Sequence, residues 1–202
     1  MKAKKDWFST KYSFGYFFML FVLVIIIKII FNNTDTVKNH DYLNLPWTAV
    51  RIDNLLIQLP SEPIKEKDSF KPEYEKIFDK MAIYAIDNND LFVSIMQVVV
   101  NVNYVDRWNI EESSESILNQ VLFNLKAQNL KINTNYYDES KNLHFIESEF
   151  TYKSKIGHAT SLGLQNDKEI YIITIVTPES SIELDKVIQK ISTSIKLLNL
   201  EL

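Results

Sequence analysis

The feature that most constrains this chain is an apolar segment near its N-terminus, GYFFMLFVLVIIIKII at residues 15–30. No charged residue occurs from position 12 to position 27, and the run extends to Phe31 if Lys28 is tolerated near its end. About 20 helical residues, at roughly 1.5 Å each, cross the hydrocarbon core of a bilayer. The long stem of Lys28 can carry its amine to the headgroups. We therefore predict a transmembrane helix over residues 12–31 that binds membrane lipid.

Two alternative interpretations of this segment remain. A basic stretch followed by an apolar one also begins a secretory signal peptide, but the residues that follow, KIIFNNTDT, contain no A-x-A-like cleavage site. A buried helix of a soluble domain would need a polar face, whereas apolar side chains surround this helix on every side. We favour a retained signal-anchor over both.

The flanking charges predict the orientation of the anchor. Four of the first 11 residues are lysines, whereas only Lys38 follows the span closely, so the positive-inside rule places the N-terminus in the cytoplasm. Residues 1–11 are then a cytoplasmic segment and residues 32–46 a polar linker. Residues 47–202 form an extracytoplasmic, or periplasmic, domain of a single-pass inner-membrane protein.

Composition excludes several kinds of site. The chain has no cysteine, which rules out disulfides and thiolate chemistry, and its three glycines cannot form a glycine-rich phosphate loop for a nucleotide. Five of the 22 basic residues and one of the 26 acidic residues precede position 33, so the remainder has 17 basic and 25 acidic side chains, a net charge of -8. Such a domain is repelled by phosphate backbones, so we expect no nucleic-acid binding.

Short apolar runs alternate with turn residues after position 47. TAVRIDNLLIQLP predicts two strands joined at residues 53–54, and the proline-rich stretch at 60–72 predicts a charged surface loop. KMAIYAIDNNDLFVSIMQVVVNV predicts two more strands joined across residues 87–90. Both alternating sets of the second strand are mostly apolar, which is typical of a central strand in a sheet covered on both faces.

Two amphipathic helices are predicted. Asn109 and Glu112 have the spacing of a capping box, and an apolar stripe at helical intervals follows them. The second helix opens at Pro178 and Ser180, with Glu183 three residues further on. Between the helices lie four predicted strands, at residues 130–137, 143–152, 156–164 and 170–177. Close spacing favours hairpins, so we predict an α+β fold in which two helices cover an antiparallel sheet.

This layout resembles the PsbP-like fold, an α/β/α sandwich. The resemblance rests on a Trp and an apolar strand leading into IQLPSEP, on the element order, on a strand ending in IYIITIVTP and on a last helix closing in ISTSIKLL. It covers roughly residues 47 to 198. It implies a role in binding and assembly more often than in catalysis, and it transfers no functional residue by position.

One arrangement carries potential chemistry. If the turn of the 143–164 hairpin is centred on Ser154 and Lys155, then Glu149 and His158 are diagonal neighbours on one face. A carboxylate beside an imidazole could act as a general base, although no nucleophile accompanies the pair, and a surface ion pair is the simpler interpretation. His40, His144 and His158 are isolated in sequence, so no metal site is predicted.

Two further features are candidates for contacts. Tyr136 and Tyr137, in a predicted strand before a polar turn, are candidates for a partner surface or for plain sheet packing. The small residues at alternate positions 157, 159, 161 and 163 permit close approach, most simply by a covering helix.

The sequence thus favours an anchored binding or assembly module of the cell envelope that has a protein partner and no cofactor or catalysis. One alternative is an anchored hydrolase with its site near Glu149 and His158. The other is a small-ligand carrier with a pocket between the sheet and the helix expected at residues 109–129.

Overall fold

The computed structural model describes residues 41–66 and 76–198. The predicted transmembrane helix at residues 12–31 lies outside these ranges, as do the cytoplasmic segment and most of the linker. Within the described ranges, no helix has both the length and the apolar character needed to cross a membrane.

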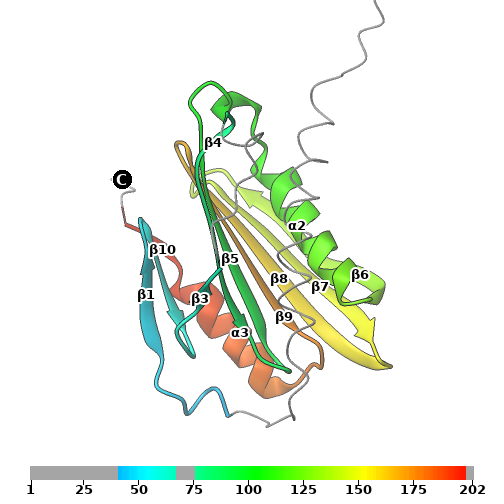
Figure 1. Cartoon of the computed structure of the whole chain (residues 1–202). Helices are drawn as coiled ribbons and strands as arrows, with labels where there is room; N and C mark the ends of the chain where they lie inside the picture. Colours follow the sequence, from blue (N-terminus) through cyan, green and yellow to red (C-terminus); the bar gives the residue numbers. More distant parts are fainter. Residues whose placement is uncertain (1–40, 67–75, 199–202) are drawn as a thin grey trace, which may run out of the picture.

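A sheet of seven antiparallel strands forms the centre of the domain (Figure 1). Its spatial order is β3-β4-β5-β9-β8-β7-β6, and five of its six neighbouring pairs are consecutive in sequence, as expected for hairpins. The bounds of these strands are β3 Ile64–Lys65, β4 Phe78–Asp87, β5 Phe92–Val100, β6 Gln128–Asp138, β7 Leu143–Tyr152, β8 Lys155–Asn166 and β9 Glu169–Thr177.

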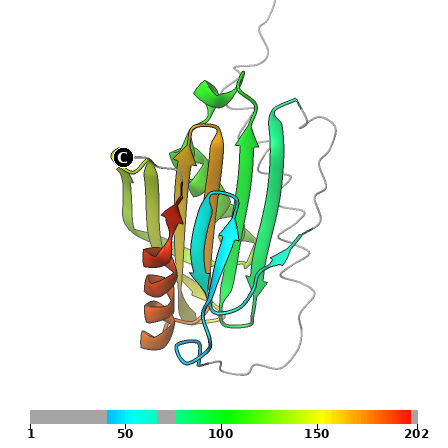
Figure 2. The ribbon, with the colours of Figure 1, turned by 90° about the vertical axis from the view of Figure 1, so that its left-hand side faces the viewer.

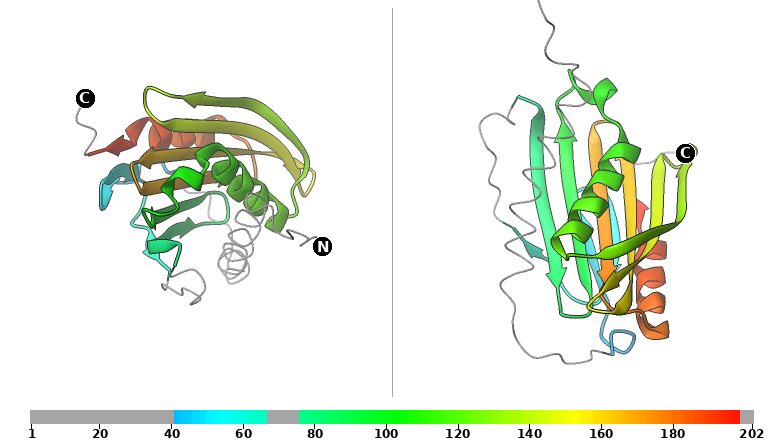
Figure 3. Two further views of the ribbon diagram at one scale, coloured as in Figure 1. Left: turned by 90° about the horizontal axis from the view of Figure 1, so that it is seen from above. Right: turned by 90° about the vertical axis from the view of Figure 1, so that its right-hand side faces the viewer.

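The two faces of this sheet are covered by different layers. Helix α2 (Ile110–Asn124) crosses one face, as the right-hand view of Figure 3 shows, and it contacts β7, β8 and β9. Helix α3 (Ile182–Ser194) lies on the opposite face beside a small three-stranded sheet (Figure 2). That sheet has the order β1-β2-β10 and contains β1 (Thr48–Ile52), β2 (Leu55–Leu59) and β10 (Lys196–Leu197). The predicted α+β sandwich is therefore confirmed, with an added second sheet.

Strand β5 occupies the position that its apolar pattern predicts. All nine of its residues are buried, and it pairs with β4 on one side and β9 on the other. Its alternate side chains enter two separate cores, with Met96 on the α2 side and Ile95 on the α3 side. A strand with cover on both faces needs apolar residues in both sets, which explains why apolar residues dominate both sets of β5.

Both helices begin at side-chain caps. The side chain of Asn109 accepts a hydrogen bond from the backbone N–H of Glu112, as predicted. The cap of α3 is Ser181, which accepts from the N–H of Leu184, so the predicted cap at Ser180 is wrong by one residue. A short 3₁₀ helix, η1 (Val105–Arg107), precedes α2.

Two elements escaped prediction because they are very short. Strand β3 has two residues and lies in the stretch predicted to be a loop, and β10 has two residues that extend the small sheet after α3. Tyr42, within the range predicted as linker, is only 1% exposed and belongs to the core beneath α3. Its backbone carbonyl accepts a hydrogen bond from Trp47 Nε1, at 3.0 Å.

The tight turns use residues other than glycine. Seven described residues have positive φ and none of them is glycine. They are Asp53, Lys126, Asn129, Asn142, Lys153, Ser154 and Asp167. The two described glycines serve close packing instead: a Cβ on Gly163 would lie 2.9 Å from Ile110 Cγ1 of α2. Helix packing against the small-residue face of β8 is thereby confirmed at this point.

Candidate functional site

The hairpin of β7 and β8 carries the histidine and carboxylate singled out in the sequence. Its two-residue turn consists of Lys153 and Ser154, both with positive φ, and Tyr152 pairs with Lys155. Glu149 therefore lies directly opposite His158 and not diagonally, so the predicted turn is wrong by one residue and each predicted cross-strand partner by two. Two successive left-handed residues close a tight primed turn, which a turn centred on Ser154 and Lys155 would not provide.

His158 lies between two carboxylates from different elements. Its Nδ1 is 2.8 Å from Asp185 Oδ1 on α3, and its Nε2 is 3.9 Å from Glu149 Oε1. Only the first distance is a hydrogen bond. The imidazole is one quarter exposed and links the first turn of α3 to the sheet. Asp185 was not anticipated, because it is 27 positions away in the chain.

His158 and Asp185 have the arrangement of a general base and the carboxylate that orients it, but no nucleophile accompanies them in the described part of the chain. In a general-base pair, one ring nitrogen bonds the carboxylate and the other must reach a nucleophile or a water. Nε2 of His158 faces Glu149, a second acceptor, across the strand pair. Within residues 41–66 and 76–198, no group of three His, Asp or Glu side chains has the geometry to hold a metal ion. The cluster is best described as a partly exposed polar link between α3 and the sheet.

Tyr136 and Tyr137 point to opposite faces of the sheet. Tyr137 pairs with His144, packs with the core under α2 and donates a hydrogen bond to Asn142. Tyr136 pairs with Phe145 on the other face, with ring centroids 5.4 Å apart, and it is 48% exposed. Of the two tyrosines, only Tyr136 therefore presents a half-exposed ring at the surface.

Tyr136 belongs to an edge strand without cover. Strand β6 is the last strand of the sheet, and none of its 11 residues is buried. Leu130 and Ile132 are each 43% exposed. The pairing with β7 is irregular between Gln128 and Thr134, whereas it is regular from Thr134 to Asp138. Open edges of this kind are the places where sheets accept another strand.

A second histidine network was missed by the sequence. His144, 1% exposed, lies between α2 and β6: its Nδ1 contacts Ser114 Oγ at 2.5 Å and its Nε2 contacts Asn135 Oδ1 at 2.8 Å. A ring with a proton on Nε2 donates to Asn135 Oδ1, and the single hydroxyl proton of Ser114 is then shared between two acceptors, Nδ1 and the carbonyl oxygen of Ile110. Burial lowers the pKa of His144.

This serine, histidine and asparagine set superficially resembles a nucleophile with its base. Ser114 is fully buried, and its hydroxyl also lies 2.7 Å from the carbonyl oxygen of Ile110. A nucleophile must meet its substrate, which a serine with no exposed surface does not. The network therefore fixes α2 on the sheet, and only the separation of its members in the chain hid it from sequence reasoning.

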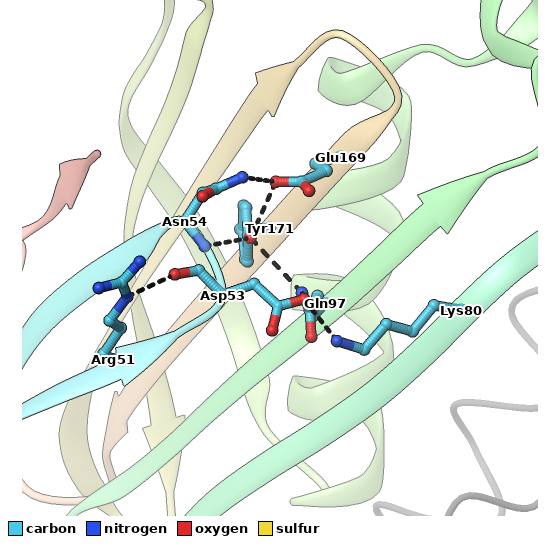
Figure 4. Close-up of polar contacts among 7 residues, drawn as sticks. All are labelled: Arg51, Asp53, Asn54, Lys80, Gln97, Glu169 and Tyr171. Carbon is cyan, nitrogen blue, oxygen red and sulfur yellow. Dashed lines mark hydrogen bonds and ion pairs between the residues drawn. The ribbon is translucent and has the colours of Figure 1, made fainter. Parts of the chain in front are cut away.

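A third polar cluster joins the small sheet to the large one (Figure 4). The turn between β1 and β2 brings Asp53 against Lys80 of β4, and Gln97 Nε2 of β5 donates to Asp53 Oδ2 at 2.7 Å. Asn54 donates from its backbone N–H to the hydroxyl of Tyr171, at 3.3 Å, and from Nδ2 to Glu169 Oε2, at 2.8 Å. Five elements thus meet around one turn.

Charge and burial explain the titration behaviour of this cluster. The hydrogen bond from Lys80 is the main cause that lowers the pKa of Asp53, and burial is the main cause that raises the pKa of Tyr171 to about 12. Gln97 is completely buried and its Oε1 has no hydrogen-bond partner. Because the other side-chain groups are paired with each other, the cluster works as a clamp between the two sheets.

Comparisons with known proteins extend this description only slightly. No family model matches the chain, and no curated protein matches its sequence. Solved structures that are similar in shape include three at 8% sequence identity. One is the Ran-binding protein Mog1p of Saccharomyces cerevisiae. The match covers 77% of this chain and 97% of Mog1p, with a TM-score of 0.46.

The other two come from Mycobacterium tuberculosis. The extracellular domain of PknH covers 70% of this chain and 84% of its own, with a TM-score of 0.33. LpqN, a protein involved in cell envelope biogenesis, covers 74% and 82%, also with a TM-score of 0.33. These identities and scores carry no conclusion about the family or function of this chain, and PsbP-like membership stays a prediction.

Proposed function

We propose that this protein is a membrane-anchored module that binds other proteins outside the cytoplasm, where it takes part in assembly at the cell envelope. The observation that supports binding most directly is strand β6, a long sheet edge that carries exposed apolar side chains on a domain whose core is otherwise covered. The anchor and the orientation are proposals from the sequence, through residues 12–31 and the lysines before them.

The polar clusters support the same proposal. The His144 network and the clamp around Asp53 both join elements of the fold to each other. Polar residues engaged in this way are used for architecture. Among the described residues, the exposed apolar side chains of Leu130, Ile132 and Tyr136 lie on one edge strand, β6. Exposed apolar groups beside a free edge are typical of protein-binding sites.

Purification of the full-length chain from its own membranes in a mild detergent tests this proposal. We expect a species larger than the monomer that retains a partner in defined proportion. A variant with Tyr136→Lys should lose that species because it places a charge on the proposed contact. An exclusively monomeric wild-type protein, found at several detergent concentrations, would contradict the proposal.

A hydrolase remains the second candidate because His158 has a carboxylate on each side. His158→Gln removes the base while keeping a polar side chain that can still reach Asp185. If the protein hydrolyses a substrate here, turnover of model esters and peptides by the wild type should disappear in this variant without a change in melting temperature. Equal activity in both proteins would remove this candidate.

The small-ligand carrier has less support. Its expected pocket lay between the sheet and α2, yet Gly163 of β8 is in such close contact with Ile110 and Ser114 that even a methyl group meets them. The inward residues of α2 are buried in the same core as the sheet strands. At this contact, the helix and the sheet are packed directly against each other.

A further inference from the structure

We infer that the edge of β6 binds the same edge of a second copy of this chain, in antiparallel register about Tyr136. This inference rests on the proposed binding function and names its partner. It starts from the regular part of the edge, because an added strand needs a straight ladder of free backbone groups. That part is Thr134 to Asp138, where the pairing with β7 has no irregularity.

A two-fold axis at Tyr136 makes this stretch complementary to itself. Tyr136 then faces its own copy, Asn135 faces Tyr137, and Thr134 faces Asp138. Residues that oppose each other in an antiparallel pair share a face, so the two Tyr136 rings meet on the face that carries Phe145. The existing pair of rings becomes a row of four across the joint. Aromatic contacts of this kind add to the backbone hydrogen bonds.

The distribution of charged residues favours the stretch from Thr134 to Asp138 for contact between two copies. The sequence beyond residue 33 carries a net charge of -8, so most pairs of faces on two such domains repel each other. The stretch from Thr134 to Asp138 contains one charged residue, Asp138, whose carboxylate lies 3.4 Å from Nζ of Lys141. In the proposed register, Asp138 faces Thr134 and not a second acid. Thr134 itself lies beside Glu147, with its Oγ1 3.5 Å from Glu147 Oε2, so acidic side chains are found at the two ends of the joint and not at its centre, Tyr136.

The irregular part of β6 limits how far the joint extends. The shifts in register near Gln128 and between Ile132 and Thr134 increase the local twist and turn the strand away from a straight neighbour. A joint of five residues belongs among the small interfaces, below about 1,200 Å² of buried surface, which are weak. We expect dimers where copies are concentrated, as they are in the plane of a membrane.

The absence of cysteine from the chain permits a sharp test by disulfide cross-linking. The full-length variant Tyr136→Cys is oxidised in native membranes and analysed without reduction. Disulfides generally require a Cα–Cα separation of about 4.4–6.8 Å, and opposed residues in an antiparallel pair lie within this range. We expect a covalent dimer at a yield roughly tenfold above that of the controls, because their sulfurs cannot meet.

Two matched controls come from the same molecule. Ile132→Cys lies on the same strand, but identical positions would be eight residues apart in this register, or about 27 Å. Asn119→Cys is exposed on the outer side of α2. A second experiment co-expresses Thr134→Cys with Asp138→Cys, where the mixed dimer should exceed either dimer alone. Melting curves of each variant confirm that it is folded.

The possible results distinguish self-association through β6 from the broader proposal that the protein binds other proteins. A Tyr136→Cys dimer without dimers of the controls supports the second copy as partner. Equal cross-linking of all variants, or none at Tyr136, overturns it. If Tyr136→Cys instead captures a different envelope protein, or if another protein co-purifies without any self-linkage, the dimer is wrong while the binding function stands. Failure of both experiments contradicts both proposals.

Discussion

Strands β5 and β6 belong to the same sheet and have opposite environments. Every residue of β5 is buried, whereas no residue of β6 is. The difference follows from cover: α2 contacts β7, β8 and β9, and α3 packs with the small sheet over the other face of the centre. The layers thus end before the last strand. Stability is concentrated in the middle of the sheet, and the surface available for binding lies at its edge.

The sharpest test of this contrast is a pair of matched truncations. Ile95→Ala, at a fully buried site, should lower the free energy of unfolding by about 2–5 kcal/mol, because it removes packed methyl groups and leaves a cavity. Ile132→Ala on β6, 43% exposed, should change it by less than about 0.5 kcal/mol. Urea unfolding of both variants measures the difference. Similar losses at both sites would show that β6 is covered in solution.

The next largest effect concerns the contact between α2 and β8. Gly163→Ala should destabilise the fold by about 1–3 kcal/mol, because the new methyl group lies within 3.0 Å of two atoms of Ile110. In a background that carries Ile110→Ala, the same substitution should cost much less, since the obstructing side chain is gone. Equal costs in both backgrounds, again by urea unfolding, would mean that α2 does not cover the sheet here.

The stability of the fold should depend on pH through His144, which lies between helix α2 and the exposed strand β6. Burial holds the pKa of His144 below its unfolded value of 6.5, so the unfolded chain binds the proton first. Its contribution to stability is therefore complete above pH 6.5 and is lost as the pH falls, by at most about 1.4 kcal/mol per pH unit. Stability measured from pH 7 to pH 4 should show this slope, and His144→Asn should not.

The carboxyl of Asp87 also changes the stability over this pH range, so that experiment has to remove its contribution. Burial raises the pKa of its carboxyl from 3.8 to about 6, so the folded state binds this proton more tightly. Its effect has the opposite sign, because stability increases as the pH falls through 6 toward 3.8. The histidine comparison should therefore be made with Asp87→Asn in both proteins. A remaining slope that is unaffected by His144→Asn would show that the ring is not buried.

The smallest effect is expected on β6 itself. Lys131 Nζ lies 3.8 Å from Glu149 Oε2, and its side chain is 72% exposed. Lys131→Gln should change the free energy of unfolding by less than about 0.5 kcal/mol, because exposed ion pairs contribute little in water. Thermal unfolding at low and high salt measures this. A loss above 1 kcal/mol would indicate, on the general scale for such pairs, an edge that is more ordered than its exposure implies.

The parts of the fold that follow local patterns were predictable from the sequence. The apolar run of β5, the turn at Asp53 and Asn54 and the cap at Asn109 each depend on residues close together in the chain, and each was found as predicted. The small sheet was not, because β10 has two residues and pairs with β2, which lies far away in sequence.

The polar clusters were less accessible to sequence reasoning. Tyr171 meets Asn54 across 117 positions, and no local pattern connects them. His144 looked isolated because its partners, Ser114 and Asn135, lie on other elements. The register of Glu149 and His158 depended on the choice of turn residues, and without a glycine in the turn the sequence did not mark them.

The choice of residues in the turns has a consequence for improving this protein. A residue with a Cβ resists the left-handed region, by roughly 1–2 kcal/mol for ordinary side chains and less for Asn and Asp. Lys153 and Ser154 both adopt it next to each other. The strands therefore impose the shape of this bend against its local preference. Asn and Gly adopt the left-handed region more readily, so replacing Lys153 and Ser154 by Asn and Gly should raise the melting temperature. The substitution lies in the turn, so the strand pairing of the sheet stays unchanged.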